Sequence, residues 1–312
     1  TIVGPEVPLV DGIRDYFDQE GLACFAPSRQ AAQLEGSKSF TKDFLTRHGI
    51  PTGAYATFTE LAEAESYIRA QGAPIVVKAD GLAAGKGVVV AHSEEEALGA
   101  VRKMLSGDAF GAAGRQVVVE EYLAGEEASF IALCDGEHVL PLASSQDHKR
   151  IGEGDTGPNT GGMGSYSPPP FWDSALECQV REKILQPVAD ELARMGSPYS
   201  GILYGGLMLT ESGPKVVEFN CRLGDPEAQV VLPRLNSDLL DIALRSSQGD
   251  LARADVEWSG LPCVAVVVAS GGYPGEYRTG LPISGLDQVD EAVTVFHAGT
   301  RVDDGPTGVA TS

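Results

Sequence analysis

Residues 74–91 hold a glycine-rich loop between two apolar segments, and this arrangement restricts the fold more than any other feature of the sequence. The loop reads GLAAGKG from Gly81 to Gly87 and runs into three valines. It departs from a Walker A loop, because only three residues separate Gly81 from Gly85 and Gly87 replaces the magnesium-binding Ser or Thr. A Walker A loop also begins a helix, whereas the valines predict a strand. The pattern therefore predicts a strand–loop–strand unit in place of a P-loop.

The composition indicates a globular protein with more than one packed unit. The 312 residues are 43% hydrophobic and 21% charged, and this length favours two or three domains. No apolar run approaches the roughly 18 residues of a membrane-spanning helix, and no charged-then-apolar leader opens the chain. We therefore expect a cytoplasmic protein. Five scattered cysteines without a CxxC spacing argue against a disulfide framework and against a zinc site.

The charge balance is strongly acidic and narrows the choice of ligands. Forty-four acidic residues against 23 basic ones give a net charge of −21. Such a surface repels nucleic-acid backbones and anionic membranes, so we expect neither as a partner. A phosphate-bearing ligand must instead be held by a local cluster of Lys, Arg and backbone N–H groups.

Hydrophobic patterning divides the chain into five parts, and both of its ends look like cuts through a longer protein. A helix at Pro8–Glu20 between short strands is typical of the end of a parallel α/β domain. Residues 144–170 read as one long loop rich in Gly and Pro. The expected units are the end of an N-terminal α/β domain, a helical part of a central domain, a small lid subdomain, a main subdomain with a metal site and an incomplete β-rich C-terminal domain, over residues 1–35, 36–73, 74–143, 144–259 and 260–312.

Lys78 lies at the end of an apolar strand, where an ammonium group is costly to bury without a partner. It could pair with Asp80 or with a glutamate of a neighbouring strand. It could also bind a phosphate, and we favour this because the following loop offers free N–H groups and its glycines allow close approach.

An acidic run follows the predicted strand at 116–122. Residues 120–127 read EEYLAGEE, and an exposed run of this kind is usually a solvated edge. Beside a nucleotide site it has a second interpretation, in which backbone groups at the strand end contact the adenine and one carboxylate accepts the ribose hydroxyls.

Glu218 and Asn220 form the strongest local signal. Alternation along a strand places both on one face together with Val216, opposite Val217 and Phe219. A carboxylate and an amide oxygen suit Mg²⁺, which takes hard oxygen ligands and completes its octahedron with water and phosphates. The alternative is a polar edge strand. The following segment CRLGDPE favours a site, because it adds the guanidinium of Arg222.

Two polar segments lie in the expected long loop. SQDHKR spans residues 145–150 and PNTGGMG spans residues 158–164. Lys149 and Arg150 could form an anion pocket with the second segment. The sequence has no GxSxG motif and its cysteines have no basic neighbours, so a protein nucleophile is not expected.

Taken together, these segments resemble the ATP-grasp superfamily and, within it, the phosphoribosylamine–glycine ligase (glycinamide ribonucleotide synthetase) family. The likeness covers nearly the whole chain, and RLGDPE at residues 222–227 is a signature of that family. It implies an ATP-grasp fold of class α/β (α+β), with the remnant of an N-terminal parallel α/β domain and a C-terminal β-rich domain. It also implies the substrates ATP, glycine and 5-phosphoribosylamine, and the products ADP, phosphate and glycinamide ribonucleotide.

The resemblance implies roles for individual residues as well. The expected ATP contacts are Lys38, Lys78, Gly85, Gly87, Glu120, Glu121, Tyr122, Leu123, Glu126 and Glu127. Mg²⁺ or Mn²⁺ would bind Glu218 and Asn220. The substrate-side residues would be Asp147, Lys149, Asn159, Gly162 and Arg222. Catalysis would fall to Arg222, Lys78 and Asp147.

The sequence departs from the family pattern at several points. It lacks the family's opening strand and Gly-Gly turn, its last residues do not match the familiar ending, and residues 203–209 hold no further metal-binding acid. Two alternatives therefore stay open, another ATP-grasp carboxylate–amine ligase and a nucleotide-binding fragment without activity. We expect a monomer.

Overall fold

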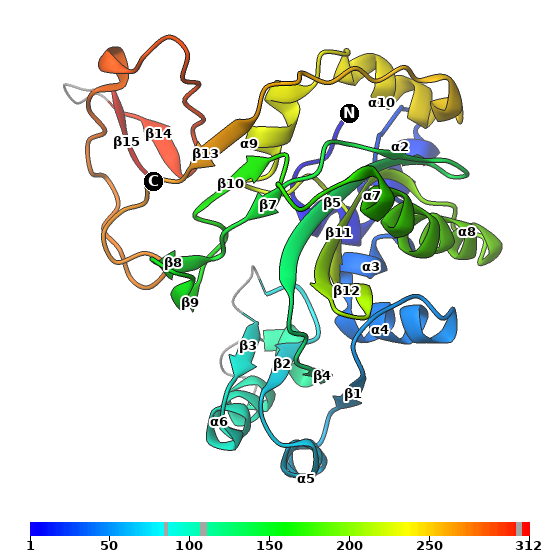
Figure 1. Ribbon diagram of the computed structural model, residues 1–312, viewed down its shortest axis with the longest axis vertical. Coiled ribbons are helices and arrows are strands. Elements are labelled where there is room, and N and C mark those ends of the chain that lie inside the picture. Colours follow the sequence, from blue (N-terminus) through cyan, green and yellow to red (C-terminus); the bar gives the residue numbers. More distant parts are fainter. Residues whose placement is uncertain (84–86, 107–110, 304–307) are drawn as a thin grey trace.

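Two antiparallel four-stranded sheets form the body of the protein. The computed structural model describes residues 1–83, 87–106, 111–303 and 308–312 (Figure 1). The larger sheet has the strand order β12-β11-β5-β6, and the smaller has the order β1-β4-β2-β3. Helix α4 (Lys38–Arg47) contacts both β12 and β4, so it links the two sheets.

The smaller sheet carries helices on one face. Its strands are β1 (Tyr55–Phe58), β2 (Ile75–Ala79), β3 (Val88–Ala91) and β4 (Val117–Glu121). Alternate residues of β2 and β4 pack against helices α5 (Leu61–Gln71) and α6 (Glu94–Leu105) in one core. The residues between them, Lys78 and Glu120 included, therefore lie on the opposite face. The short helix η1 (Gly111–Arg115) precedes β4.

The larger sheet is covered by helices on both faces. Its strands are β5 (Glu126–Asp135), β6 (Val139–Pro141), β11 (Ser200–Thr210) and β12 (Gly213–Asn220). Phe130 and Ala132 of β5 join a core with α4 and a long helical run, whereas Ile131 and Leu133 join a second core. That run comprises α7 (Ser174–Val180), the π-helical segment η2 (Arg181–Leu185) and α8 (Gln186–Arg194). The second core includes α9 (Ala228–Val231) and α10 (Leu239–Ser247).

The N-terminal segment packs against the first of these cores. The helix expected over Pro8–Glu20 is two helices, α1 (Glu6–Asp11) and α2 (Ile13–Gln19), because Gly12 between them has φ 89° and ends α1. A parallel bridge joins Ile2 to Phe25, which agrees with the expected end of a parallel α/β domain. Helix α3 (Gln33–Gly36) leads into α4.

Residues 144–170 are not a structureless loop, and that expectation was wrong. They contain β7 (Gln146–Asp147), β8 (Arg150–Gly152), β9 (Thr156–Asn159) and β10 (Gly164–Ser167). Strand β10 pairs with β7 and with β13 (Cys263–Val266), while β8 pairs with β9. The strands escape sequence patterning because they have only two to four residues each, too few to show a clear alternation. The last elements are η3 (Leu232–Arg234), η4 (Leu251–Arg253), η5 (Leu286–Gln288), β14 (Thr300–Val302) and β15 (Val309–Thr311).

The expected boundary at residue 143 separates strands that belong together. Strand β5 pairs with β11 of the larger sheet and with β6, whereas the expected boundary places β5 and β6 in the lid subdomain. Strand β1 pairs within the smaller sheet and α5 packs against it, whereas the expected boundary places both in the helical part. The smaller unit therefore covers residues 55–121, because sheet pairing rather than sequence order decides its members. Within the described part of the chain, no helix has the length and apolarity to cross a membrane.

Candidate functional site

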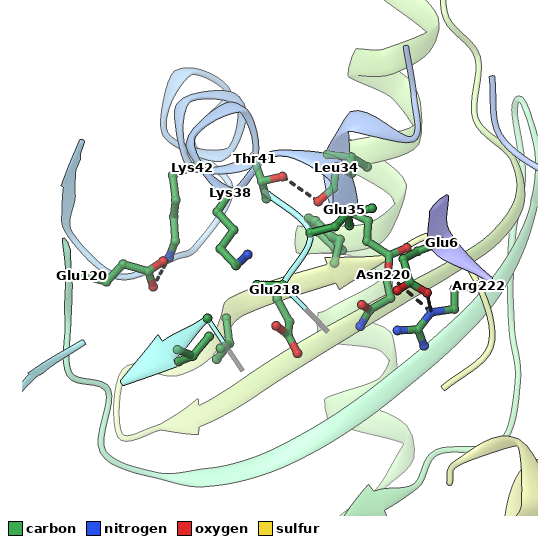
Figure 2. Close-up of a pocket in the computed structure, with 16 residues that line it drawn as sticks. Glu6, Leu34, Glu35, Lys38, Thr41, Lys42, Glu120, Glu218, Asn220 and Arg222 are labelled. Carbon is green, nitrogen blue, oxygen red and sulfur yellow. Dashed lines mark hydrogen bonds and ion pairs between the residues drawn. The ribbon is translucent and has the colours of Figure 1, made fainter. Parts of the chain in front are cut away.

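A cavity of about 110 Å³ lies between α4, the smaller sheet and β12. Figure 2 shows lysines at one end of it and the Glu6–Glu35–Arg222 group at the other. Of the residues predicted from the sequence, six line this cavity: Lys38, Gly87, Glu120, Glu218, Asn220 and Arg222. The structure thus brings together side chains that are up to 184 positions apart (38 to 222).

Lys78 and Glu120 form a buried ion pair on the face of the smaller sheet opposite α5 and α6. Lys78 Nζ lies 3.0 Å from Oε2 of Glu120 and donates to the carbonyl of Val217 at 3.1 Å. Strands β2 and β4 are paired so that Val76 faces Glu120 and Lys78 faces Val118, which makes the charged residues diagonal neighbours. The pairing with a neighbouring glutamate that the sequence left open is therefore present, whereas Asp80 has other partners.

Helix α4 presents two lysines to the cavity. Lys38 and Lys42 are four positions apart and so lie on one face of the helix. Lys38 Nζ donates to the carbonyl of Gly81 at 2.9 Å, and Asp80 accepts from the amide of Ser39 at 2.7 Å. The N-terminus of α4 is thus fixed to the residues that follow β2. Burial lowers the pKa of Lys38, against the opposing charge of Glu218.

Glu218 and Asn220 project into the cavity, but Val216 does not accompany them. The register between β11 and β12 shifts beside Gly206, so that Gly206 faces Glu218 and the next residue faces Val216. Val217 is therefore the extra residue of a β-bulge. Val216 and Phe219 are both buried in the same core, three positions apart. Alternation along an unbroken strand predicted the wrong face for Val216 because it does not account for the bulge.

The charges around Glu218 favour its ionised form. Burial would raise the pKa of this carboxyl, but Lys149, Lys78, Lys38 and Arg222 together hold the pKa below its usual value. About a third of the side chain is exposed. A carboxylate and an amide oxygen that both face the cavity fit Mg²⁺, which needs few protein ligands when phosphates and water complete its shell. Among the described residues no group of three or more His, Cys, Asp or Glu could hold a metal ion.

Arg222 is held by two acids at the far end of the cavity. Its Nε lies 3.4 Å from Oε1 of Glu35 and 3.5 Å from Oε2 of Glu6. Glu35 also accepts from the amide of Cys221 at 2.7 Å. Burial raises the pKa of Glu35 to about 7, although Arg222 and the amide of Cys221 oppose the rise. This end can therefore offer both a cation and acids to a small zwitterion.

A second, smaller cavity adjoins the first, and Val217 lines both. Asp147 and Lys149, expected on the substrate side, border it together with Glu127, which was expected to contact ATP. Lys149 Nζ lies 3.2 Å from Glu127 and 3.8 Å from Glu218. Burial raises the pKa of Asp147 to about 7 against the charge of Lys149.

Not every predicted residue reaches a cavity. Lys78, Asn159 and Gly162 line neither of the two cavities described, although Lys78 contacts Glu120, which lines the first. Gly162 instead permits a close approach to the RLGDPE segment, since an added Cβ would lie 2.3 Å from Cδ of Pro226. Glu121, Tyr122, Leu123 and Glu126 lie on β4, β5 and the link between them. Gly85 lies outside the described residues.

Three charged residues of the first cavity were missed by sequence reasoning: Lys42, Glu35 and Glu6. The i,i+4 spacing of Lys38 and Lys42 was a usable signal. Glu6 and Glu35 precede the residues expected to contact ATP, and nothing local in the sequence connects them with Arg222.

Comparison with family models gives the class of the protein. Residues 36–228 match the ATP-grasp (A) domain of phosphoribosylglycinamide synthetase. Residues 1–35 match the N domain of the same family, and residues 263–312 match its C domain. The chain is therefore an ATP-grasp protein.

Curated relatives agree on one enzyme. Phosphoribosylamine–glycine ligase of Vibrio parahaemolyticus is 56% identical over 307 residues, which are 98% of this chain and 72% of that protein. The enzyme of the same name from Escherichia coli is 56% identical over 306 residues, 97% of this chain and 71% of that protein. The chain belongs to the phosphoribosylglycinamide synthetase family.

Solved structures support the fold. Phosphoribosylamine–glycine ligase of Thermotoga maritima superposes with a TM-score of 0.83 at 34% identity, covering 92% of this chain and 71% of that one. The biotin carboxylase domain of 2-oxoglutarate carboxylase from Hydrogenobacter thermophilus, solved with MgADP, gives a TM-score of 0.69 at 17% identity. It covers 100% of this chain and 66% of that one, and at this identity the likeness concerns the fold alone.

Proposed function

We propose that this chain joins glycine to 5-phosphoribosylamine at the expense of ATP, forming glycinamide ribonucleotide, ADP and phosphate in purine biosynthesis. The observation that carries the proposal is the convergence of Lys38, Glu218, Asn220 and Arg222 on one cavity, where Glu120 of the same lining forms an ion pair with Lys78. We also propose that the protein acts as a cytoplasmic monomer.

The cation-rich end of the cavity would bind the phosphates of ATP. Lys38 and Lys78 supply ammonium groups there. Glu218 and Asn220 would hold Mg²⁺ or Mn²⁺, which when bound neutralises charge on the phosphates. Gly87 and the residues before it would cover them. The β4–β5 link at Glu121–Leu123 would contact the adenine, and Glu127 or Glu126 would hold the ribose.

The chemistry needs no protein nucleophile. An oxygen of the glycine carboxylate attacks the γ-phosphorus, the bond to the β-phosphate oxygen breaks, and ADP leaves. The amine of phosphoribosylamine then attacks the carbonyl carbon of glycyl phosphate, loses a proton and expels phosphate. Phosphoryl transfer depends on alignment and charge neutralisation, which Lys78 and Arg222 would supply.

The second substrate would approach through the neighbouring cavity. Asp147 and Lys149 border this cavity, and Nζ of Lys149 lies 3.8 Å from Oε1 of Glu218 in the first cavity. We therefore propose that both residues contact the second substrate. Asn159 and Gly162 stay proposed substrate contacts, although they line neither cavity.

The test is ADP release with different pairs of substrates. We expect release that requires glycine and phosphoribosylamine together, and only background release when either is replaced by another amino acid or amine. Equal release with a different pair would indicate another ATP-grasp ligase. Binding of ATP without glycine-dependent turnover would indicate a protein that binds nucleotides without catalysis.

A further inference from the structure

The ion pair of Lys78 has a third member, Lys42, and the group of three is positively charged. Lys42 Nζ lies 2.9 Å from Oε2 of Glu120, the same oxygen that Lys78 contacts at 3.0 Å. The three side chains are 2%, 4% and 5% exposed for Lys42, Lys78 and Glu120. Two ammonium groups share one carboxylate oxygen, so a net charge of about +1 is buried beside the cavity. Buried charge needs compensation, and an anion in the cavity would provide it.

Lys42 is also anchored to the strand that carries the metal-binding candidates. Its Nζ donates to Oγ1 of Thr52 at 2.8 Å, and Thr52 donates to the carbonyl of Val216 at 2.8 Å. Lys78 donates to the next carbonyl, that of Val217. Lys78 therefore contacts β12 at its bulge directly, and Lys42 contacts the neighbouring residue through Thr52. Glu120 lies between the two ammonium groups. Figure 2 shows Lys42 extended from α4 to Glu120.

We infer that Lys42 is a positioning residue for Lys78. Lys42 neutralises Glu120, so that Glu120 orients the ammonium of Lys78 without cancelling its charge toward the phosphates of ATP. This inference rests on the proposed ATP site and adds a residue to it. Burial lowers the pKa of Lys42 and the charge of Glu120 opposes this, which is consistent with an ion pair that Lys42 forms with Glu120.

A double-mutant cycle of Lys42 and Glu120 tests whether the net charge of the three side chains determines the affinity for MgADP. Lys42→Met leaves Glu120 paired with Lys78 alone, so the group becomes neutral and binding of MgADP should weaken by about tenfold or more, the effect of one charge-assisted contact. Lys42→Met combined with Glu120→Gln restores the net charge of +1 and keeps an amide oxygen that can accept from Lys78, so MgADP should again bind within about twofold of the wild type. Adenosine, which has no phosphate, should bind all variants equally.

The readout is the dissociation constant of MgADP and of adenosine from titration calorimetry, with thermal unfolding of each variant. Lys103→Met is the matched control, because Lys103 is exposed on α6 and the change removes the same charge from the protein. It should bind MgADP as the wild type does. If Lys42→Met does not fold, Glu120→Gln alone decides, since it keeps both lysines and should bind MgADP at least as tightly as the wild type.

The outcomes separate this inference from the proposed function. A wild-type protein that binds no MgADP would overturn the ATP site itself. Where the wild type binds, a double variant as weak as Lys42→Met would overturn the inference and make Lys42 a direct phosphate ligand. Weaker binding of adenosine by Lys42→Met would also overturn it, because structural damage affects both ligands.

Discussion

Burial in the site changes the pKa of Glu35 strongly. It is 6% exposed and lies between Arg222 and the amide of Cys221. Burial nevertheless raises its pKa from 4.5 to about 7. Between these two values the folded state binds more protons than the unfolded state does, so the contribution of this group to stability is present at low pH and is lost as the pH rises toward 7.

Replacing Glu35 by Gln should therefore make the protein less sensitive to pH. A glutamine keeps the acceptor for the amide of Cys221 and cannot ionise. We expect the free energy of unfolding of Glu35→Gln, relative to the wild type, to increase from pH 5 to about pH 7 and then to level off in urea titrations. A difference that stays constant over this range would contradict the raised pKa.

Glu218 tests the metal site. Glu218→Gln keeps the size of the side chain and removes the charge that Mg²⁺ prefers. We expect the Mg²⁺ concentration for half-maximal ADP formation to rise by about tenfold or more. Glu211→Gln, an exposed acid after β11, is the control and should titrate like the wild type. An unchanged Mg²⁺ titration for Glu218→Gln would remove this residue from the site.

At the same scale, sequence reasoning found residues whose setting is local and missed residues whose partners are distant. Lys78, Glu218 and Asn220 could be predicted because each ends or follows a recognisable apolar strand. The ion pairs of Lys42 with Glu120 and of Arg222 with Glu35 join positions 78 and 187 apart (42 to 120, 35 to 222). Such pairs depend on how the sheets are placed, which local patterns do not specify.

At the scale of elements, strand–loop–strand geometry around Gly87 separates this protein from Walker A nucleotide-binding proteins. Strand β3 pairs antiparallel with β2, with Val88 opposite Lys78, as the valine run predicted. Gly87 accepts a hydrogen bond through its carbonyl from the amide of Ala79 at 2.8 Å. The proposed cover over the phosphates, residues 81–87, therefore ends directly beside Lys78, and its residues 84–86 lie outside the described part.

Substituting Gly87 tests that cover. An added Cβ would lie 2.6 Å from Cβ of Ala83 and 3.3 Å from Cβ of Ala79, so Gly87→Ala must displace the segment. We expect turnover to fall by about a hundredfold, as a displacement near 1 Å can produce, measured as steady-state ADP release. Gly99→Ala is the control, because nothing lies within 4 Å of its added Cβ, and turnover should be unchanged. Unchanged turnover in Gly87→Ala would exclude a role in closure.

Helices were predictable where a capping residue precedes a run with helical periodicity. The start of α4 at Ser37, which caps the amide of Phe40 at 3.1 Å, and the start of α6 at Ser93 follow from capping residues. The four strands within residues 146–167 were not predictable, because strands of two to four residues carry no clear alternation. The bulge at Val217 was not predictable either, because it is defined by the pairing of β12 with β11.

At the scale of the whole molecule, the site lies where two sheets and one helix meet. The smaller sheet contributes Lys78 and Glu120, the larger contributes Glu218 and Asn220, and α4 contributes Lys38 and Lys42. The strongly acidic composition required a local cationic cluster for any phosphate ligand, and the lysines of this site form one. The division into subdomains was predicted less well. Residues 55–121, which form the smaller sheet and its helices, are inserted in the sequence between α4, which contacts β12 of the larger sheet, and β5, which belongs to that sheet.

In the proposed reaction, the carboxylate of glycine is activated as glycyl phosphate within this site. The most direct measurement uses glycine labelled with ¹⁸O in both carboxylate oxygens, with mass analysis of the released phosphate. The oxygen that attacks the γ-phosphorus stays on phosphorus when the amine displaces phosphate, so each turnover should transfer one ¹⁸O to phosphate and leave one in the amide. Phosphate without ¹⁸O, formed at the rate of glycinamide ribonucleotide synthesis, would contradict the account.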